Sequence, residues 1–169
     1  RREVLTRLFT VGYEVENKSS ATVQPDAYFQ LVRDGKAPDG DSALLPTYTG
    51  MAVYTDREKI QKVAFADVDK GKIAYPKKSN DGWIALLQHY FLSAWLPANN
   101  APREFYTQRL DNGLYAAGFI VSLGSIEPGA RGALTVPLYA GPGEQDKLSQ
   151  LAPGLDLTID YGWLTVIAK

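Results

Sequence analysis

The 169-residue sequence contains no cysteine, which excludes disulfide bonds and thiolate metal sites. His89 is the only histidine, so a multi-histidine metal site is excluded and a catalytic triad would have to use this one side chain. The 18 basic and 19 acidic side chains nearly cancel, so no net charge favours nucleic acid or an anionic membrane as a partner. No window of about 18 apolar residues could span a bilayer. Met51 is the only methionine, and we expect the chain to be processed or to be a fragment.

The composition is typical of one folded domain. Hydrophobic residues make up 45% of the chain and charged residues 22%. Most of the sequence alternates apolar and polar residues with a period of two, which indicates half-buried strands. Residues 8–17 and 21–32 flank a turn cluster and are predicted to form a hairpin. Residues 33–46 are predicted to form a long loop, and residues 51–56 and 59–65 a second strand pair.

The strongest turn signal is the Asp-Asn-Gly sequence at 111–113. Asn-Gly tolerates the positive φ angles of a tight turn, so we expect a hairpin between 103–110 and 114–123. The second of these strands is apolar on both faces and should be covered on both sides. A further strand is predicted at 133–141, where Pro137 suggests a sheet edge or a bulge.

One segment, residues 83–96, breaks the period of two. It has eleven apolar residues and three polar ones, which would fall within about 140° of arc on a helix but on both faces of a strand. We therefore predict a helix here, ended by Pro97. A second short helix is predicted within 141–153, and residues 155–160 are interpreted as a last extended piece. The predicted fold is mainly β, a β-sandwich with two or three helices packed against it.

Candidate catalytic and metal-binding groups are few. Asp67 and Asp69 begin like a calcium loop, but lysines follow where further ligands should stand, which favours a solvated turn. His89 is interpreted as structural or solvent-facing. Two carboxylate pairs are better explained as solvated surface than as an acid and a base: Asp39 with Asp41, and Asp156 with Asp160. The residues therefore predict a binding or scaffolding domain that is not an enzyme, with no catalytic, cofactor-binding or metal site.

Four blocks of the sequence carry a resemblance to a known family. They are GWIALLQHYFLSAWLP (82–97), FYTQRLDNGLYAAGF (105–119), LYAGPGEQDKL (138–148) and LAPGLDLTIDYGWL (151–164). From about residue 8 onward, the chain resembles the first large periplasmic loop of the YidC membrane protein insertases, in the YidC/Oxa1/Alb3 family. The resemblance implies a twisted β-supersandwich, galactose-mutarotase-like, with C-terminal α-helices and without the N-terminal strands of the full family domain.

The resemblance also implies a place and a role. The domain is expected on the periplasmic side of the bacterial inner membrane, between the first and second transmembrane helices of a multi-pass protein. It would support insertion and folding of inner-membrane proteins as a non-catalytic scaffold. Its expected partners are Sec translocon accessory subunits and nascent membrane proteins, with no cofactor and no nucleic acid. Residues 1–160 would form the β-sandwich domain and residues 161–169 the start of the connection to a transmembrane helix.

Two groups of residues are candidates for these roles. In the predicted helix, the large apolar side chains would anchor the C-terminal helices or form an interaction surface: Trp83, Leu87, Phe91 and Trp95. Near the C-terminus, four residues would form the membrane-proximal connection, where Tyr and Trp suit a membrane interface: Asp160, Tyr161, Trp163 and Leu164.

Two alternatives remain open from the residues. One is a carbohydrate-binding or mutarotase-like sandwich, in which Tyr48, Tyr54 and Tyr75 would be exposed and line a groove. The other is a chaperone cleft that binds lipid or peptide.

Overall fold

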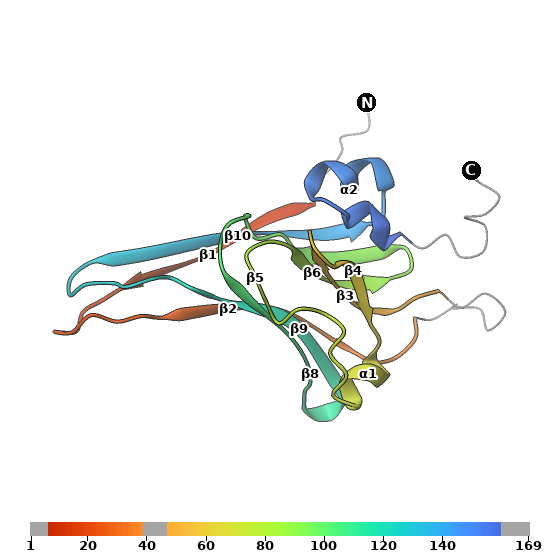
Figure 1. The fold of residues 1–169 in the computed structure, drawn as a ribbon, viewed down its shortest axis with the longest axis horizontal. Helices are drawn as coiled ribbons and strands as arrows, with labels where there is room; N and C mark the ends of the chain where they lie inside the picture. Colours follow the sequence, from red (N-terminus) through yellow and green to blue (C-terminus); the bar gives the residue numbers. More distant parts are fainter. Residues whose placement is uncertain (1–6, 39–46, 160–169) are drawn as a thin grey trace.

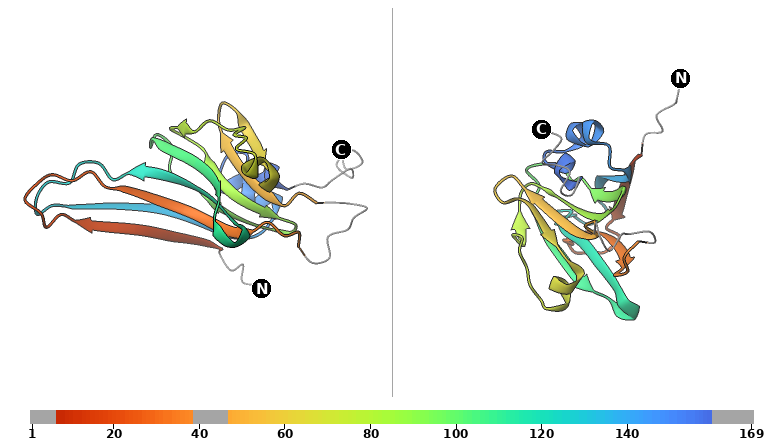
Figure 2. Two further views of the ribbon diagram at one scale, coloured as in Figure 1. Left: turned by 90° about the horizontal axis from the view of Figure 1, so that it is seen from below. Right: turned by 90° about the vertical axis from the view of Figure 1, so that its right-hand side faces the viewer.

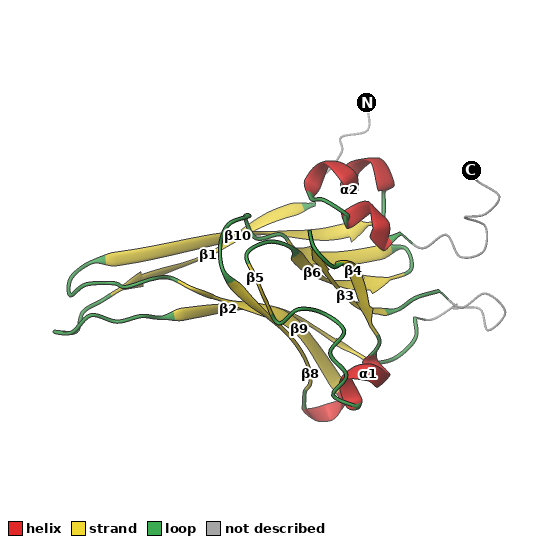
Figure 3. Ribbon diagram, in the orientation of Figure 1, coloured by secondary structure: helices red, strands yellow, loops and turns green. Residues whose placement is uncertain are grey.

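Two antiparallel sheets make up most of the computed structural model, which describes residues 7–38 and 47–159. The six-stranded sheet has the order β1 (Leu8–Glu16), β10 (Arg131–Pro142), β7 (Phe91–Trp95), β6 (Trp83–Gln88), β3 (Gly50–Thr55) and β4 (Lys59–Val63). The four-stranded sheet has the order β2 (Asp26–Asp34), β9 (Leu114–Ser122), β8 (Arg103–Arg109) and β5 (Lys78–Ser79). The helical elements are short: α1 (Phe65–Asp69), η1 (Asp111–Gly113), α2 (Gln145–Leu151) and η2 (Leu155–Thr158). The prediction of a mainly β fold is confirmed (Figure 3).

The main core lies between the two sheets (Figure 1). Phe29 of β2 stacks on Phe119 of β9, with ring centroids 5.3 Å apart, and meets Trp95 of β7 edge to face at 5.1 Å. The contact between Phe29 and Trp95 joins the four-stranded sheet to the six-stranded sheet. Burial of large aromatic side chains of this kind is a main source of stability in a sandwich.

A second core lies on the outer face of the six-stranded sheet, where α2 and η2 cover it. Leu148 of α2 and Leu155 of η2 are completely buried there. Figure 2 shows this helical segment on one side of the sheet, away from the four-stranded sheet. The central strands of the six-stranded sheet are therefore covered on both faces.

The predicted helix at 83–96 is wrong: this segment is the hairpin of β6 and β7. Its alternate side chains face two different cores, so Trp83 lies under the C-terminal helices whereas Ile84 faces the other sheet. A strand buried on both faces has no polar face, and its continuous apolar run cannot be told from a buried helix by periodicity. Gln88 and His89, which set the polar stripe of the predicted helix, lie instead at the exposed end of the hairpin.

The predicted hairpin of 8–17 with 21–32 is also wrong, because β1 and β2 belong to different sheets. β1 pairs with β10 and β2 pairs with β9, both antiparallel. The chain crosses between the sheets at Asn17, whose buried side-chain amide donates to the backbone oxygens of Ala21 and Ile126. Alternation identified both strands, but their partners lie 80 or more residues away in the sequence.

The other local predictions differ in outcome. The strand pair at 51–65 is confirmed as β3 with β4, and the Asn-Gly turn is confirmed, with φ of 61° at Asn112 and 73° at Gly113. The short helix in 141–153 is confirmed as α2, but 155–158 form η2 and are not extended. β9 is only partly covered on its second face, because Leu114 and Ile120 are exposed. None of the helices in the described part of the chain is long and apolar enough to cross a membrane.

Candidate functional site

A cleft of about 390 Å³ opens where the end of β2 approaches the β6–β7 hairpin. Its walls come from both sheets: Val32, Arg33 and Asp34 from the four-stranded sheet, and Leu86, Gln88, Phe91, Leu92 and Ser93 from the six-stranded sheet. The side chains of Val32 and Phe91 are 44% and 56% exposed. The cleft thus presents apolar surface to solvent beside a small set of polar groups.

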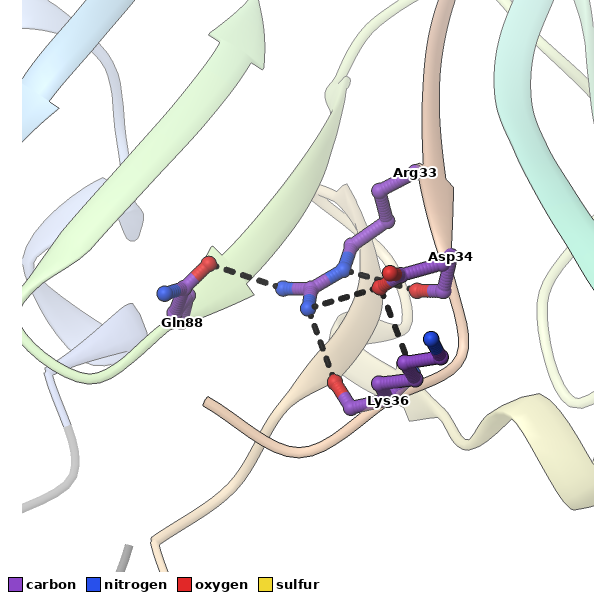
Figure 4. A network of polar contacts seen from close by, with 4 residues as sticks. All are labelled: Arg33, Asp34, Lys36 and Gln88. Atoms are coloured by element: carbon purple, nitrogen blue, oxygen red, sulfur yellow. Dashed lines mark hydrogen bonds and ion pairs between the residues drawn. The ribbon is translucent and has the colours of Figure 1, made fainter. Parts of the chain in front are cut away.

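Arg33 ties the two sheets together at this cleft (Figure 4). Its Nη1 donates to Gln88 Oε1 at 3.0 Å, its Nε to the Asp34 backbone oxygen at 2.9 Å and its Nη2 to the Lys36 backbone oxygen at 2.9 Å. An ion pair with the Asp34 carboxylate at 3.5 Å completes the network, and the guanidinium lies 5.8 Å from the centroid of the Phe65 ring. Because acceptors from the protein already engage the guanidinium, Arg33 acts as a link between the sheets rather than as a free anion-binding group.

The second feature is the attachment of the C-terminal helical segment to the six-stranded sheet. Trp83 Nε1 donates to the Pro153 backbone oxygen at 2.9 Å, and the indole stacks on Tyr54 with centroids 5.5 Å apart. Gly154 has a φ of 71°, and a Cβ at this position would lie 2.3 Å from Tyr54 Cε2. The turn between α2 and η2 can therefore lie flat on the Tyr54 ring only with glycine at this position. A smaller cavity of about 220 Å³ adjoins it, bounded in part by Leu96.

A buried arginine fixes the loops beside this attachment. Arg103 is only 4% exposed, and its guanidinium donates to five backbone oxygens, those of Asn80, Gly82, Pro97, Ala98 and Ala101. Burial lowers the pKa of Arg103, and the nearby Asp81 carboxylate opposes that shift. The Arg103 side chain supplies hydrogen-bond donors to the backbone carbonyl groups of two loops, 80–82 and 97–101, so its role is to hold those loops in place.

The structure separates the four residues expected on the predicted helix. Trp83 and Leu87 face α2 and η2, whereas Trp95 faces the core between the sheets. Phe91 stands exposed at the cleft. The four expected connection residues lie outside the described part of the chain: Asp160, Tyr161, Trp163 and Leu164.

The candidate catalytic groups form no acid and base arrangement where they are described. His89 is exposed at the turn of the β6–β7 hairpin. Asp69 accepts hydrogen bonds from the Tyr115 hydroxyl at 2.9 and 3.1 Å and forms an ion pair with Arg109 at 3.2 Å. The hydrogen bond to Asp69, and then burial, raise the pKa of Tyr115. Asp39, Asp41 and Asp160 lie outside the described residues, and within the described ranges no three acidic or histidine side chains gather as a metal site would require.

The carbohydrate-binding alternative requires Tyr48, Tyr54 and Tyr75 to line an exposed groove, and the structure contradicts this arrangement. Tyr54 and Tyr75 are each 6% exposed, and they belong to different cores on opposite faces of the six-stranded sheet. Tyr48 is half-buried and donates from its hydroxyl to the Met51 backbone oxygen. Burial raises the pKa values of Tyr48 and Tyr75 above the usual range for tyrosine. These rings build the fold, and they offer no sugar-binding platform.

Sequence reasoning missed the Arg33–Gln88 link and the Arg103 cluster. Gln88 gave one signal, as a polar residue inside an apolar run, but its partner lies 55 residues earlier on another sheet. Arg103 gave none, because its acceptors are backbone oxygens that no sequence pattern marks.

Comparison with known proteins assigns the chain to a family. A family profile described as "YidC periplasmic domain" matches residues 7–169. A protein named "Membrane protein insertase YidC" from Nitrosomonas europaea is 59% identical over 159 residues, which is 94% of this chain and 26% of that protein. Proteins of the same name from Nitrosospira multiformis and Aromatoleum aromaticum are 55% and 54% identical over 95% of this chain, which spans 28% and 30% of their lengths. The chain therefore spans less than a third of these relatives, and it belongs to the family of YidC periplasmic domains.

Proposed function

We propose that this periplasmic, non-catalytic domain serves a membrane protein insertase as a scaffold and as a docking surface for Sec translocon accessory subunits. It would thereby support insertion and folding of nascent inner-membrane proteins. The observation that carries this proposal is the rigid attachment of the C-terminal segment to the sheet by Trp83, Gly154 and the buried Leu148 and Leu155. A scaffold must hold its surfaces at a fixed orientation to the rest of its protein, and this attachment supplies that rigidity on the C-terminal side.

The free strand edges supply surfaces for docking or for further strands. β1 has nine residues, pairs with β10 alone among the described strands, and exposes Phe9 and Tyr13. An unpaired edge of this length recruits another strand readily. We propose that the N-terminal strands of the full family domain pair here and complete the twisted supersandwich, and that residues 1–160 belong to that one domain. Residues 161–169 would then start the connection to a transmembrane helix.

Site-specific photo-crosslinking tests the docking role. A photoreactive amino acid would replace Glu14 on β1, Tyr28 on β2 or Gln88 at the cleft in the full-length insertase, and adducts would be identified in inner membranes. We expect adducts with Sec accessory subunits from at least one surface position, and none from a matched buried position such as Val53. If no surface position yields an adduct with a translocon subunit or a nascent membrane protein, the docking proposal fails.

The cleft favours a second candidate function, the transient holding of an apolar segment of a substrate. Its exposed Phe91 and Val32 offer contact area, while the engaged Arg33 offers no free charge. Replacing Phe91 with Ser should weaken binding of a fluorescent apolar peptide to the purified chain, whereas Tyr28→Ser on the outer face of β2 should leave it unchanged. Equal binding by both variants would contradict this second function.

A further inference from the structure

The turn between β6 and β7 carries an exposed aromatic pair that no function described above requires as a unit. Tyr90 is 72% exposed, more than any other large hydrophobic side chain in the described part of the chain, and Phe91 beside it is 56% exposed. A single exposed aromatic residue is ordinary, but here two adjacent ones lie at the end of a hairpin, Tyr90 in the turn and Phe91 at the start of β7 beside the cleft.

This tip is held next to the end of the described C-terminal segment. Gly143 donates its backbone N–H to the Tyr90 oxygen at 2.8 Å. A Cβ on Gly143 would lie 3.3 Å from Ile159 Cγ1 and 3.7 Å from the Tyr90 oxygen, so Tyr90, Gly143 and Ile159 are in close proximity. Ile159 is the last residue described before Asp160. The hairpin tip and Ile159 therefore lie at one end of the elongated molecule (Figures 1 and 2).

The opposite end of the molecule has a different chemical character. There the turns at 17–25 and 123–130 meet through polar contacts, such as the Thr22 hydroxyl with the Glu127 carboxylate and the Gln24 amide with the Ser125 hydroxyl. The aromatic tip is thus confined to the end of the molecule at which Ile159 lies. Another exposed apolar side chain, Leu157 at 52%, lies in that same C-terminal segment.

We propose that the Tyr90–Phe91 tip rests in the headgroup region of the bilayer, so that the domain stands on the membrane with its C-terminal end down. This inference rests on the proposed function, in which the segment after Ile159 leads to the membrane. Tyrosine and other aromatic side chains prefer the membrane interface, because an apolar ring can be buried while a polar atom stays hydrated.

The charges near the tip indicate how this contact would be held. Lys147 on α2 is paired with Glu144, and Asp146 and Asp156 lie on the same helical segment. Charges of both signs are present, so burial of the two rings, and not attraction to anionic lipid, holds the tip at the surface. The contact should therefore persist at high salt and should not require anionic lipid.

The cysteine-free sequence allows a direct test. Single-cysteine variants Tyr90→Cys and, as controls, Ser20→Cys at the opposite end and Tyr28→Cys on β2 would carry an environment-sensitive fluorophore. Each chain would be attached through a C-terminal histidine tag to phosphatidylcholine vesicles containing a nickel-chelating lipid and nitroxide-labelled lipid. We expect nitroxide lipid to quench the fluorophore at position 90 at least about twice as strongly as at positions 20 and 28, and we expect this difference to persist at high salt. Equal quenching at all three positions, or emission from position 90 that stays as in water, would overturn the proposal.

A second measurement keeps the aromatic side chains in place. Untethered wild-type chain should sediment with the same vesicles several-fold more than Tyr90→Ser/Phe91→Ser, whereas Tyr28→Ser should match the wild type. Undiminished sedimentation of the double variant would refute membrane contact by the tip. A change in the fluorophore emission at position 90 that occurs only after a protein partner is added would also refute membrane contact, and would assign the tip to a protein interface. These results are independent of the crosslinks to Sec subunits, so either proposal can fail alone.

Discussion

The substitution Trp83→Phe tests whether the β6–β7 hairpin fastens the C-terminal helical segment to the sheet. Trp83 is 2% exposed, stacks on Tyr54 and donates a hydrogen bond to Pro153. Phenylalanine keeps an aromatic ring on Tyr54 but removes the N–H and two ring carbons. A net hydrogen bond contributes about 1 kcal/mol and each buried carbon about 0.8 kcal/mol, so the expected loss is about 2 to 3 kcal/mol.

Amide hydrogen exchange locates that loss. If Trp83 holds the segment, α2 and η2 should open locally while the two sheets stay folded. A loss of about 2 to 3 kcal/mol in the opening free energy would accelerate exchange of the protected amides in 145–158 by roughly 30- to 150-fold. Exchange in β9, within the other core, should change much less.

Trp95→Phe is the matched control. Trp95 lies on the same hairpin and is 6% exposed, but it faces the core between the sheets, and its buried indole N–H has no hydrogen-bond partner among the described residues. This variant should lower the free energy of global unfolding, measured by urea denaturation, without selective exchange in 145–158. If Trp83→Phe behaves in the same way as Trp95→Phe, the anchoring role of Trp83 is refuted.

Three further substitutions test other parts of the structure. Gly154→Ala should destabilise the chain by about 1 to 3 kcal/mol more than Gly71→Ala in urea denaturation, because both have a positive φ but only Gly154 lies against Tyr54; equal losses would contradict the packing. Burial raises the pKa of Tyr106 to about 12. The stability that the protonated phenol contributes is therefore complete below its unfolded pKa near 10 and is lost as the pH rises through 12. In the variant Tyr106→Phe, stability should decline less steeply over this pH range, and the absorbance at about 295 nm should lose one phenol that titrates late. Arg33→Met should remove the link between the sheets and speed exchange at the end of β2, and unchanged exchange there would show that the link is dispensable.

Local sequence signals predicted what depends on neighbours in the sequence. The Asn-Gly turn at 111–113 requires positive φ at two positions, and that requirement alone fixed the β8–β9 hairpin. The short loop between β3 and β4 likewise made the 51–65 pair predictable. β1 and β2 were recognised as strands, but their partners β10 and β9 are distant in the sequence, so alternation could not reveal that they belong to different sheets.

The candidate site was less accessible to prediction. Trp83, Leu87 and Trp95 were selected for their size and apolarity, and only the register of the β6–β7 hairpin, which pairs Trp95 with Ile84, separates the first two from the third. The helix interpretation failed because a second core covers the outer face of the sheet, which removed the polar residues that normally mark a strand. Family membership came from residue identity along the chain, not from any physical pattern.

The apolar character of β6 on both faces has a consequence for how the hairpin finds its alignment. A strand with one wet face cannot slip by one residue, because the slip would drive polar groups inward. In β6, such a slip would exchange one set of apolar side chains for another, so the polarity of its residues hardly distinguishes the native register from a shifted one. The register must therefore be specified by side-chain packing and directed contacts. Only the native register directs the indole N–H of Trp83 towards the Pro153 backbone oxygen. Because Pro153 follows the hairpin by some 60 residues, this hydrogen bond forms only after the segment around Pro153 has been synthesised. The contact that favours the native register of β6 therefore becomes available late.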